Sequence, residues 1–271
     1  MITIALAWLL SASGAFAHGD LHEQILSVTE QLTKHPKDAQ LYFKRAELHR
    51  AHGEFPDALA DLDQAARLNP KLDAVDLARG KTCVEARQPA LATNALTRFL
   101  AKHPDHADAW LTRGRAFALL GQGRAAAADF TQAITRAQNA SPDLYLERAR
   151  ALSASGGELV EEALHGLEEG LRKLGPLVTL ELAAIDLELK LKRHDAALHR
   201  VDRITEQMPR KETWFARSAE ILELAGRPAE ARTAWRKALQ ALEALPERLR
   251  TLKATTQLES KIRLALADDK P

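Results

Sequence analysis

The chain has 271 residues, of which 46% are hydrophobic, 5% are aromatic and 28% are charged. Its 38 basic and 37 acidic residues leave a net charge of +1, and no basic stripe with interleaved aromatic residues is present, which argues against a nucleic-acid-binding protein. The single cysteine, Cys83, excludes an internal disulfide, and we expect it to be a buried apolar thiol.

The amino-terminal segment, residues 1–17, has the pattern of a signal peptide. An apolar run over residues 2–10 is followed by small residues and by Ala15-Phe16-Ala17, a small-x-small ending that suits signal peptidase. The pattern predicts a signal peptide over residues 1–17, cleavage after Ala17, and an exported protein, periplasmic or secreted, without a stable membrane anchor. Because no Lys or Arg precedes the apolar run, an uncleaved anchor stays open as the alternative.

Cleavage after Ala17 would make a histidine the new amino terminus. The free amine and imidazole of His18, together with His22, could bind copper, as an N-terminal histidine does in copper-dependent exported enzymes. A histidine left by signal cleavage is more often incidental. We therefore predict no metal site and no cofactor, and keep a copper-binding protein as an alternative.

An amphipathic helix is expected before the repeats begin. Leu21, Ile25, Val28 and Leu32 recur at helical spacing. Because the end of a stacked array needs a partly polar lid, residues 18–38 are predicted to form an N-terminal capping helix.

Prolines at a constant interval indicate a repeat. Pro36, Pro70 and Pro104 are evenly spaced along the chain. At the same offset after each proline comes a small residue, which is Ala46, Gly80 or Gly114. A period of this length predicts a stacked repeat array rather than one globular core.

Each block between two prolines predicts a helical hairpin. From Ala39, apolar residues at helical spacing run to Gly53, which supplies the left-handed residue that ends a helix. A second helix carries Pro56 in its first turn, where a missing amide costs nothing, and ends at Asn69-Pro70. Neither helix could bury its apolar stripe alone.

The blocks resemble the tetratricopeptide repeat family. In the block 39–72, the residues that match the family pattern are Tyr42, Ala46, Gly53, Phe55, Ala58, Leu62, Ala65 and Pro70. The resemblance extends over residues 39–245, in six blocks at about 39–72, 73–106, 107–140, 142–177, 178–211 and 212–245. The block 142–177 fits only with one or two residues inserted near Gly157, and the block 178–211 is the most diverged.

The resemblance implies an all-α protein, a right-handed α-solenoid of about six helical hairpins. No run of alternating β-branched residues suggests a sheet. Pro246 is expected to start a final helix, so residues 246–271 are predicted to be a C-terminal capping helix with a short tail. Stability should be lowest over residues 153–195, where glycines interrupt the pattern, and any hinge is expected there.

Arginine recurs at the seventh position of the first four blocks, as Arg45, Arg79, Arg113 and Arg148. A row of cations could receive an acidic peptide or a phosphate. The alternative is an internal ion pair, which we favour because two of these arginines are followed by an aspartate at one and the same offset. These pairs are Arg45 with Asp61 and Arg113 with Asp129. Arg79 has no acidic residue at that offset, so it is expected to be free.

A binding groove is implied by the resemblance, because the first helices of tetratricopeptide hairpins line a concave surface. Its fifth positions would form an apolar strip, flanked by charges at the ninth positions, that could hold a peptide. The predicted groove residues are Phe43, Glu47, Leu77, Lys81, Leu111, Arg115, Leu146 and Arg150. Packing of these side chains along the seam between repeats is the alternative.

No catalytic pattern is present: neither a glycine-rich phosphate loop, nor a nucleophile elbow, nor a zinc signature occurs. The histidine pairs 49/52 and 194/199 show no carboxylate at metal-ligand spacing. We therefore predict a non-enzymatic scaffold that binds another protein or a peptide segment. A structural subunit of an envelope complex is a further alternative.

Overall fold

The structure, a computed structural model, describes residues 20–267. Within this range the chain forms helices and turns and no β-strand, which confirms the all-α prediction. The helices fall into two compact units that divide between Ala140 and Ser141. This division lies before residues 153–195, where the hinge was expected. The predicted signal peptide and His18 lie outside the described residues.

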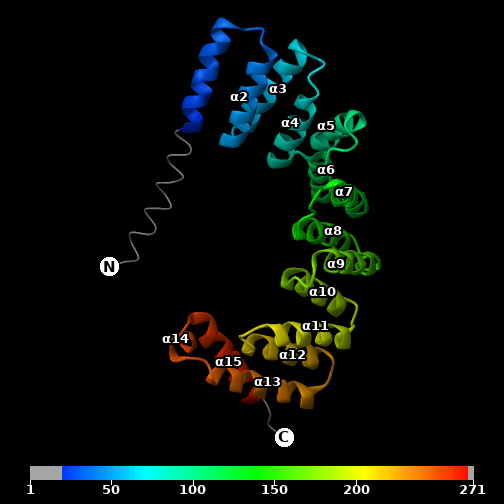
Figure 1. Ribbon diagram of the computed structural model, residues 1–271, viewed down its shortest axis with the longest axis vertical. Helices are drawn as coiled ribbons and strands as arrows, with labels where there is room; N and C mark the ends of the chain where they lie inside the picture. Colours follow the sequence, from blue (N-terminus) through cyan, green and yellow to red (C-terminus); the bar gives the residue numbers. More distant parts are fainter. Residues whose placement is uncertain (1–19, 268–271) are drawn as a thin grey trace, which may run out of the picture. The chain divides into compact units, whose positions relative to one another are not determined.

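Unit 1 contains a helix over residues 20–34 and three helical hairpins (Figure 1). The hairpins are α2 (Ala39–His52) with α3 (Phe55–Leu68), α4 (Ala74–Glu85) with α5 (Pro89–Lys102), and α6 (Ala107–Leu119) with α7 (Gly123–Arg136). The two helices of each hairpin contact each other, α3 contacts α4, α5 contacts α6, and α4 also contacts both α2 and α6. Unit 1 is therefore a stack of hairpins, as the repeat period predicts.

The tight turn inside each hairpin depends on one left-handed residue. Gly53 has φ 86° and Gly121 has φ 71°, and at the corresponding place in the second hairpin Arg87 adopts φ 58° although it is not glycine. The residue after Gly53, Glu54, donates its N–H back to the His49 carbonyl at 2.8 Å, which satisfies a helix-terminal carbonyl. The same bond recurs in the next two hairpins.

Small residues are required where the two helices of a hairpin approach. A Cβ atom added at Gly80 would collide with the Leu96 side chain, and one at Gly114 would lie 2.9 Å from the Phe130 ring. Cys83 is 1% exposed in the same core, as expected, and burial raises the pKa of its thiol.

The helix over residues 20–34 occupies the place of a second hairpin helix. Its buried Val28 precedes the buried Leu62 of α3 by one repeat length. Its Thr29 accepts a hydrogen bond from Arg45 at 3.0 Å, just as Thr97 of α5 accepts one from Arg113 at 3.0 Å. The predicted cap is thus built like half of a repeat.

Unit 2 contains the remaining helices. They are α8 (Pro142–Ala154), η1 (Gly157–Leu159), α9 (Val160–Leu174), α10 (Val178–Lys190), α11 (His194–Gln207), α12 (Glu212–Leu224), α13 (Pro228–Glu243), α14 (Glu247–Arg250) and α15 (Lys253–Ala267). The short 3₁₀ helix η1 accounts for the insertion expected near Gly157. Helix α10 contacts both α9 and α11, so the diverged block 178–211 is packed into the stack.

The carboxyl-terminal end differs from the prediction. The helix that follows Pro246 is the four-residue α14, and a turn at Thr251-Leu252 separates it from α15. Leu252 is 46% exposed, whereas Ile262 of α15 is fully buried in a core with α12 and α13 residues. The cap is therefore α15, because this helix presents an apolar face to α13.

None of the helices within residues 20–267 combines the length and apolar composition needed to cross a membrane.

Candidate functional site

The arginines at the seventh repeat position are internal ion pairs. Arg45 binds Asp61 with two bonds, Nε to Oδ2 at 2.7 Å and Nη2 to Oδ1 at 2.7 Å. Arg113 binds Asp129 in the same way, at 2.7 and 2.9 Å. The hydrogen bond that Arg45 donates to Asp61 raises the pKa of Arg45. The ion-pair interpretation is confirmed for both, and a cation row for a ligand is not formed.

The expectation that Arg79 is free is wrong. Its Nη1 lies 2.6 Å from Oδ1 of Asp63, which precedes it in the sequence and lies on α3. Arg45 and Arg113 use the residues at the same offset before them, Thr29 and Thr97. The pair could have been predicted from the sequence, because Asp63 precedes Arg79 by the same number of residues by which Asp61 follows Arg45.

Arg148 in unit 2 is buried and bridges α8 to α9. It donates to the Gly166 carbonyl at 3.0 Å and to Glu169 Oε2 at 2.7 Å. Desolvation would raise the pKa of Glu169, but hydrogen bonds from Lys173 and Arg148 outweigh it and lower that pKa.

The predicted apolar groove positions of unit 1 are half-buried rather than open. Phe43 packs against the core that contains Ala46 and Leu62, and Leu77 packs against the core that contains Cys83. Leu111 is half-buried as well. These contacts agree with the seam alternative for Phe43 and Leu77.

The charges beside these positions bind one another across neighbouring first helices. Lys81 of α4 lies 2.6 Å from Asp108 of α6. Arg50 of α2 lies 2.7 Å from Glu85 of α4 and 3.4 Å from Glu47. Two predicted groove charges, Glu47 and Lys81, are thus engaged within unit 1. The side chain of Arg115, a third predicted groove charge, is solvent-exposed.

In unit 2 the predicted residues Leu146 and Arg150 line a pocket of about 400 Å³ between α8 and α10. The α10 residues that complete it include Leu182, Asp186 and Lys190. Leu182 is 38% exposed, so an apolar surface is available to a partner. Leu182 and Asp186 stand at the fifth and ninth positions of block 178–211, so the rule that gave Leu146 and Arg150 would also have found them.

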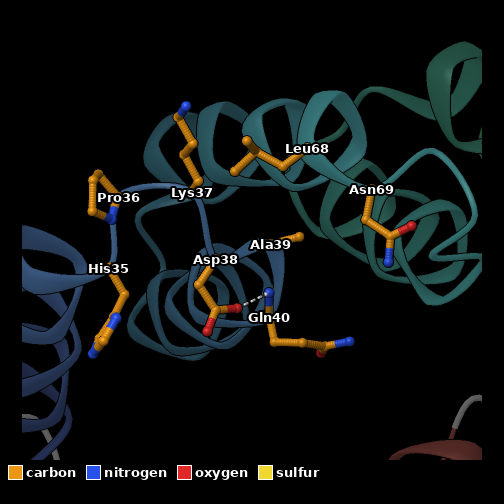
Figure 2. A pocket seen from close by; sticks show the side chains of 8 residues that line it. All are labelled: His35, Pro36, Lys37, Asp38, Ala39, Gln40, Leu68 and Asn69. Atoms are coloured by element: carbon orange, nitrogen blue, oxygen red, sulfur yellow. Dashed lines mark hydrogen bonds between the residues drawn. The ribbon is translucent and has the colours of Figure 1, made fainter.

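A second pocket, of about 730 Å³, lies at the end of the first hairpin of unit 1 (Figure 2). Its lining includes His35, Lys37 and Asn69 from the hairpin ends. Asp38 turns toward Gln40 and accepts its N–H at 2.8 Å, which caps the start of α2. The predicted groove residues do not line this pocket, and its carboxylate is already used for capping.

The structure corrects the prediction that His49 and His52 have no nearby carboxylate. Glu54 reaches both of them, with Oε2 at 2.6 Å from His49 Nδ1 and Oε1 at 3.0 Å from His52 Nδ1. The His49 hydrogen bond lowers the pKa of Glu54. The turn at Gly53 brings these groups together, which helical spacing alone did not reveal. His22 is exposed, and its ring centroid lies 6.4 Å from that of His52.

Part of the chain matches a known repeat family. Residues 9–73 and 77–142 match the tetratricopeptide repeat family. The SGT1 homolog protein of Oryza sativa subsp. japonica is 31% identical over 85 residues, which cover 31% of this chain and 23% of that protein. The match therefore spans less than a quarter of that relative's length.

Solved structures with the same fold cover nearly the whole chain. The C-terminal part of a TPR repeat-containing protein from Cytophaga hutchinsonii is 15% identical, with a TM-score of 0.66, over 92% of this chain and 98% of that one. A tetratricopeptide repeat protein from Parabacteroides merdae is 16% identical, with a TM-score of 0.55, over 95% of this chain and 98% of that one. At these identities the likeness shows the fold alone. Residues 9–73 and 77–142 thus match the tetratricopeptide repeat family, and the helical hairpins of both units have the fold of these solved structures.

Proposed function

We propose that this protein is an exported, non-enzymatic scaffold that binds a peptide segment of another protein. The tetratricopeptide fold is typical of protein–protein interaction scaffolds, which use the surface lined by successive first helices. The proposal contains no catalytic step and no cofactor. It assigns the peptide to the pocket between α8 and α10 of unit 2.

The exposed Leu182 at this pocket carries the proposal. Leu146 and Leu187 lie beside it and supply further apolar surface. Arg150 and Lys190 give the pocket two cations, against the one carboxylate of Asp186. An occupant that complements this lining is a short segment with one apolar anchor and a neighbouring acidic residue.

Site-specific photo-crosslinking tests this assignment. A benzophenone amino acid replaces Leu182 in one sample and Leu264 in a control; Leu264 is 64% exposed on α15 of the same unit. We expect a discrete adduct with a partner protein at position 182 and none at 264. Arg150→Glu should weaken formation of the adduct. Equal labelling at both positions, or none at 182, would refute the pocket as the binding site.

Export is a separate part of the proposal. It rests on the signal-peptide pattern of residues 1–17. Amino-terminal sequencing of the protein from its native cell should give His18 as the first residue. A protein that retains Met1 would contradict cleavage. Copper binding through His18 and His22 stays the alternative to the predicted absence of a metal site, and the same sample can test it.

A further inference from the structure

Imidazole and carboxylate groups gather at the turn of the first hairpin. His49 lies in the last turn of α2, Glu54 lies in the turn itself, and Asp57 lies in the first turn of α3. One ligand atom from each of the three lies within 4.8 Å of the other two. The group thus draws on both helices of the hairpin, and its members are not among the predicted groove residues.

The backbone of the turn fixes these positions. Gly53 takes the left-handed conformation with φ 86°, and its N–H binds the Arg50 carbonyl at 3.0 Å. The Glu54 N–H binds the His49 carbonyl at 2.8 Å, which holds Glu54 against the end of α2. Pro56 then restricts the backbone where α3 starts. The ligand atoms therefore converge through ordered backbone rather than through a long loop.

The two ring nitrogens of His49 face different carboxylates. Its Nδ1 lies 2.6 Å from Glu54 Oε2, while its Nε2 lies 3.9 Å from Asp61 Oδ2. Asp61 is itself held by two bonds from Arg45. At 3.9 Å the Asp61 carboxylate lies beyond hydrogen-bond distance of Nε2, so the ring of His49 is held at Nδ1, by Glu54.

The repeat itself does not require these residues. One repeat later, the positions of His49, Glu54 and Asp57 are occupied by Cys83, Gln88 and Leu91. Two repeats later, they are occupied by Phe117, Gln122 and Ala125. All three hairpins of unit 1 nevertheless fold alike, so the potential ligands are a property of the first hairpin and not of the fold.

We propose that this turn binds one zinc ion through His49 Nδ1, Glu54 and Asp57. Imidazole nitrogen and carboxylate oxygen are ligands that zinc accepts, at about 2.0–2.2 Å. Ligand atoms around a tetrahedral zinc lie about 3.4 Å apart, so closure from the observed spacing needs only small side-chain rotations. The ion takes the place of the hydrogen bond between His49 Nδ1 and Glu54. His52 or a water molecule completes the coordination.

A zinc titration of the metal-free full chain tests the site. We expect one zinc per chain, a higher unfolding temperature with zinc, and the visible absorption of a four-coordinate site when Co²⁺ is used instead. Glu54→Gln and Asp57→Asn should each weaken zinc binding by at least about 10-fold. Asp57 is exposed, so Asp57→Asn keeps the test valid if Glu54→Gln disturbs the turn.

A matched control comes from a second histidine–carboxylate pair in unit 1. His103 lies 3.4 Å from Asp73, but Lys102 binds the same carboxylate at 2.5 Å, and its cation opposes a metal there. His103→Gln should leave zinc affinity unchanged. Failure of the full chain to take up zinc would overturn the proposal. So would uptake that survives Glu54→Gln and Asp57→Asn but is lost in His22→Gln, because this result would place the ion at the amino terminus.

Discussion

The two units bind their inward-facing arginines in different ways. In unit 1, Arg45 and Arg113 each bind one aspartate of their own hairpin with the same geometry. In unit 2, Arg200 of α11 binds carboxylates from two other helices, α9 and α10. Its partners are Glu168 at 3.1 Å, Glu181 at 2.9 Å and Glu188 at 2.7 Å. Both arrangements join three helices, but the first uses one aspartate and a threonine hydroxyl, whereas the second uses three carboxylates.

The positive and negative charges in the Arg200 network are also less evenly matched than those in the arginine–aspartate pairs of unit 1. Burial would lower the pKa of Arg200, but hydrogen bonds with Glu181 and Glu188 outweigh it and raise that pKa. Glu188 Oε2 is buried and has no hydrogen-bond partner among the described residues. Where the repeat pattern is weakest, the fold thus depends on a cation that compensates two buried carboxylates, Glu181 and Glu188. Loss of that cation should cost more than loss of any one pair in unit 1.

The largest effect is expected for Arg200→Met. The substitution leaves Glu188 without its cation and Glu181 with only the exposed Arg203, and breaking a buried ion pair on one side costs about 3–5 kcal/mol. Urea unfolding should show this loss in the transition of unit 2. Adding Glu181→Gln and Glu188→Gln to Arg200→Met should restore most of the stability. A loss below about 1 kcal/mol would mean that the network does not hold the helices together.

A smaller effect should separate two arginines of unit 1. Arg113→Ala leaves Asp129, whose side chain is 6% exposed, without its partner, at a cost of about 1–3 kcal/mol. Arg79→Ala leaves Asp63, whose side chain is 53% exposed and can be hydrated, so it should cost less than about 1 kcal/mol. Thermal unfolding of both variants measures the difference. Equal losses would show that burial of the partner does not decide the effect.

The smallest effect should be the same in both units. Arg87 and Lys192 adopt φ 58° and 57° at hairpin turns where Gly53, Gly121 and Gly226 occur in other repeats. Arg87→Gly and Lys192→Gly should each stabilise by up to about 1 kcal/mol, because relief of left-handed strain exceeds the entropy that glycine gains in the unfolded chain. Chemical denaturation measures the gain. Gly53→Ala should move the midpoint in the opposite direction.

The fold could be predicted from the sequence because the same pattern of residues recurs in each repeat. The prolines and glycines marked the hairpin ends, and the offset from Arg45 to Asp61 correctly paired two helices. The error at Arg79 arose because the offset was applied in one direction only. The final helix was misplaced because Pro246 marks a helix start without saying how far the helix continues, and a turn at Thr251 interrupts it.

The candidate sites were harder to predict from the sequence, because they depend on contacts between side chains on different helices. The family rule for groove positions could not say that Lys81 would bind Asp108 on the next first helix. The rule for groove positions identified two residues of the α8–α10 pocket, Leu146 and Arg150. It would also have identified Leu182 if it had been applied to block 178–211. The cluster at His49 was missed because Gly53 reverses the chain, so that residues on successive helices meet around Glu54.

The hydrogen bonds of the seventh-position arginines also bear on mechanical behaviour. Arg45 binds Thr29 on the helix before its own and Asp61 on the helix after it, so one guanidinium group spans three consecutive helices. A pull along the stacking direction of unit 1 must break a polar contact each time a hairpin leaves its predecessor. Under tension, unit 1 should therefore unfold one whole hairpin at a time. The hydrogen bonds of each seventh-position arginine to the preceding helix should have to break before the next hairpin separates.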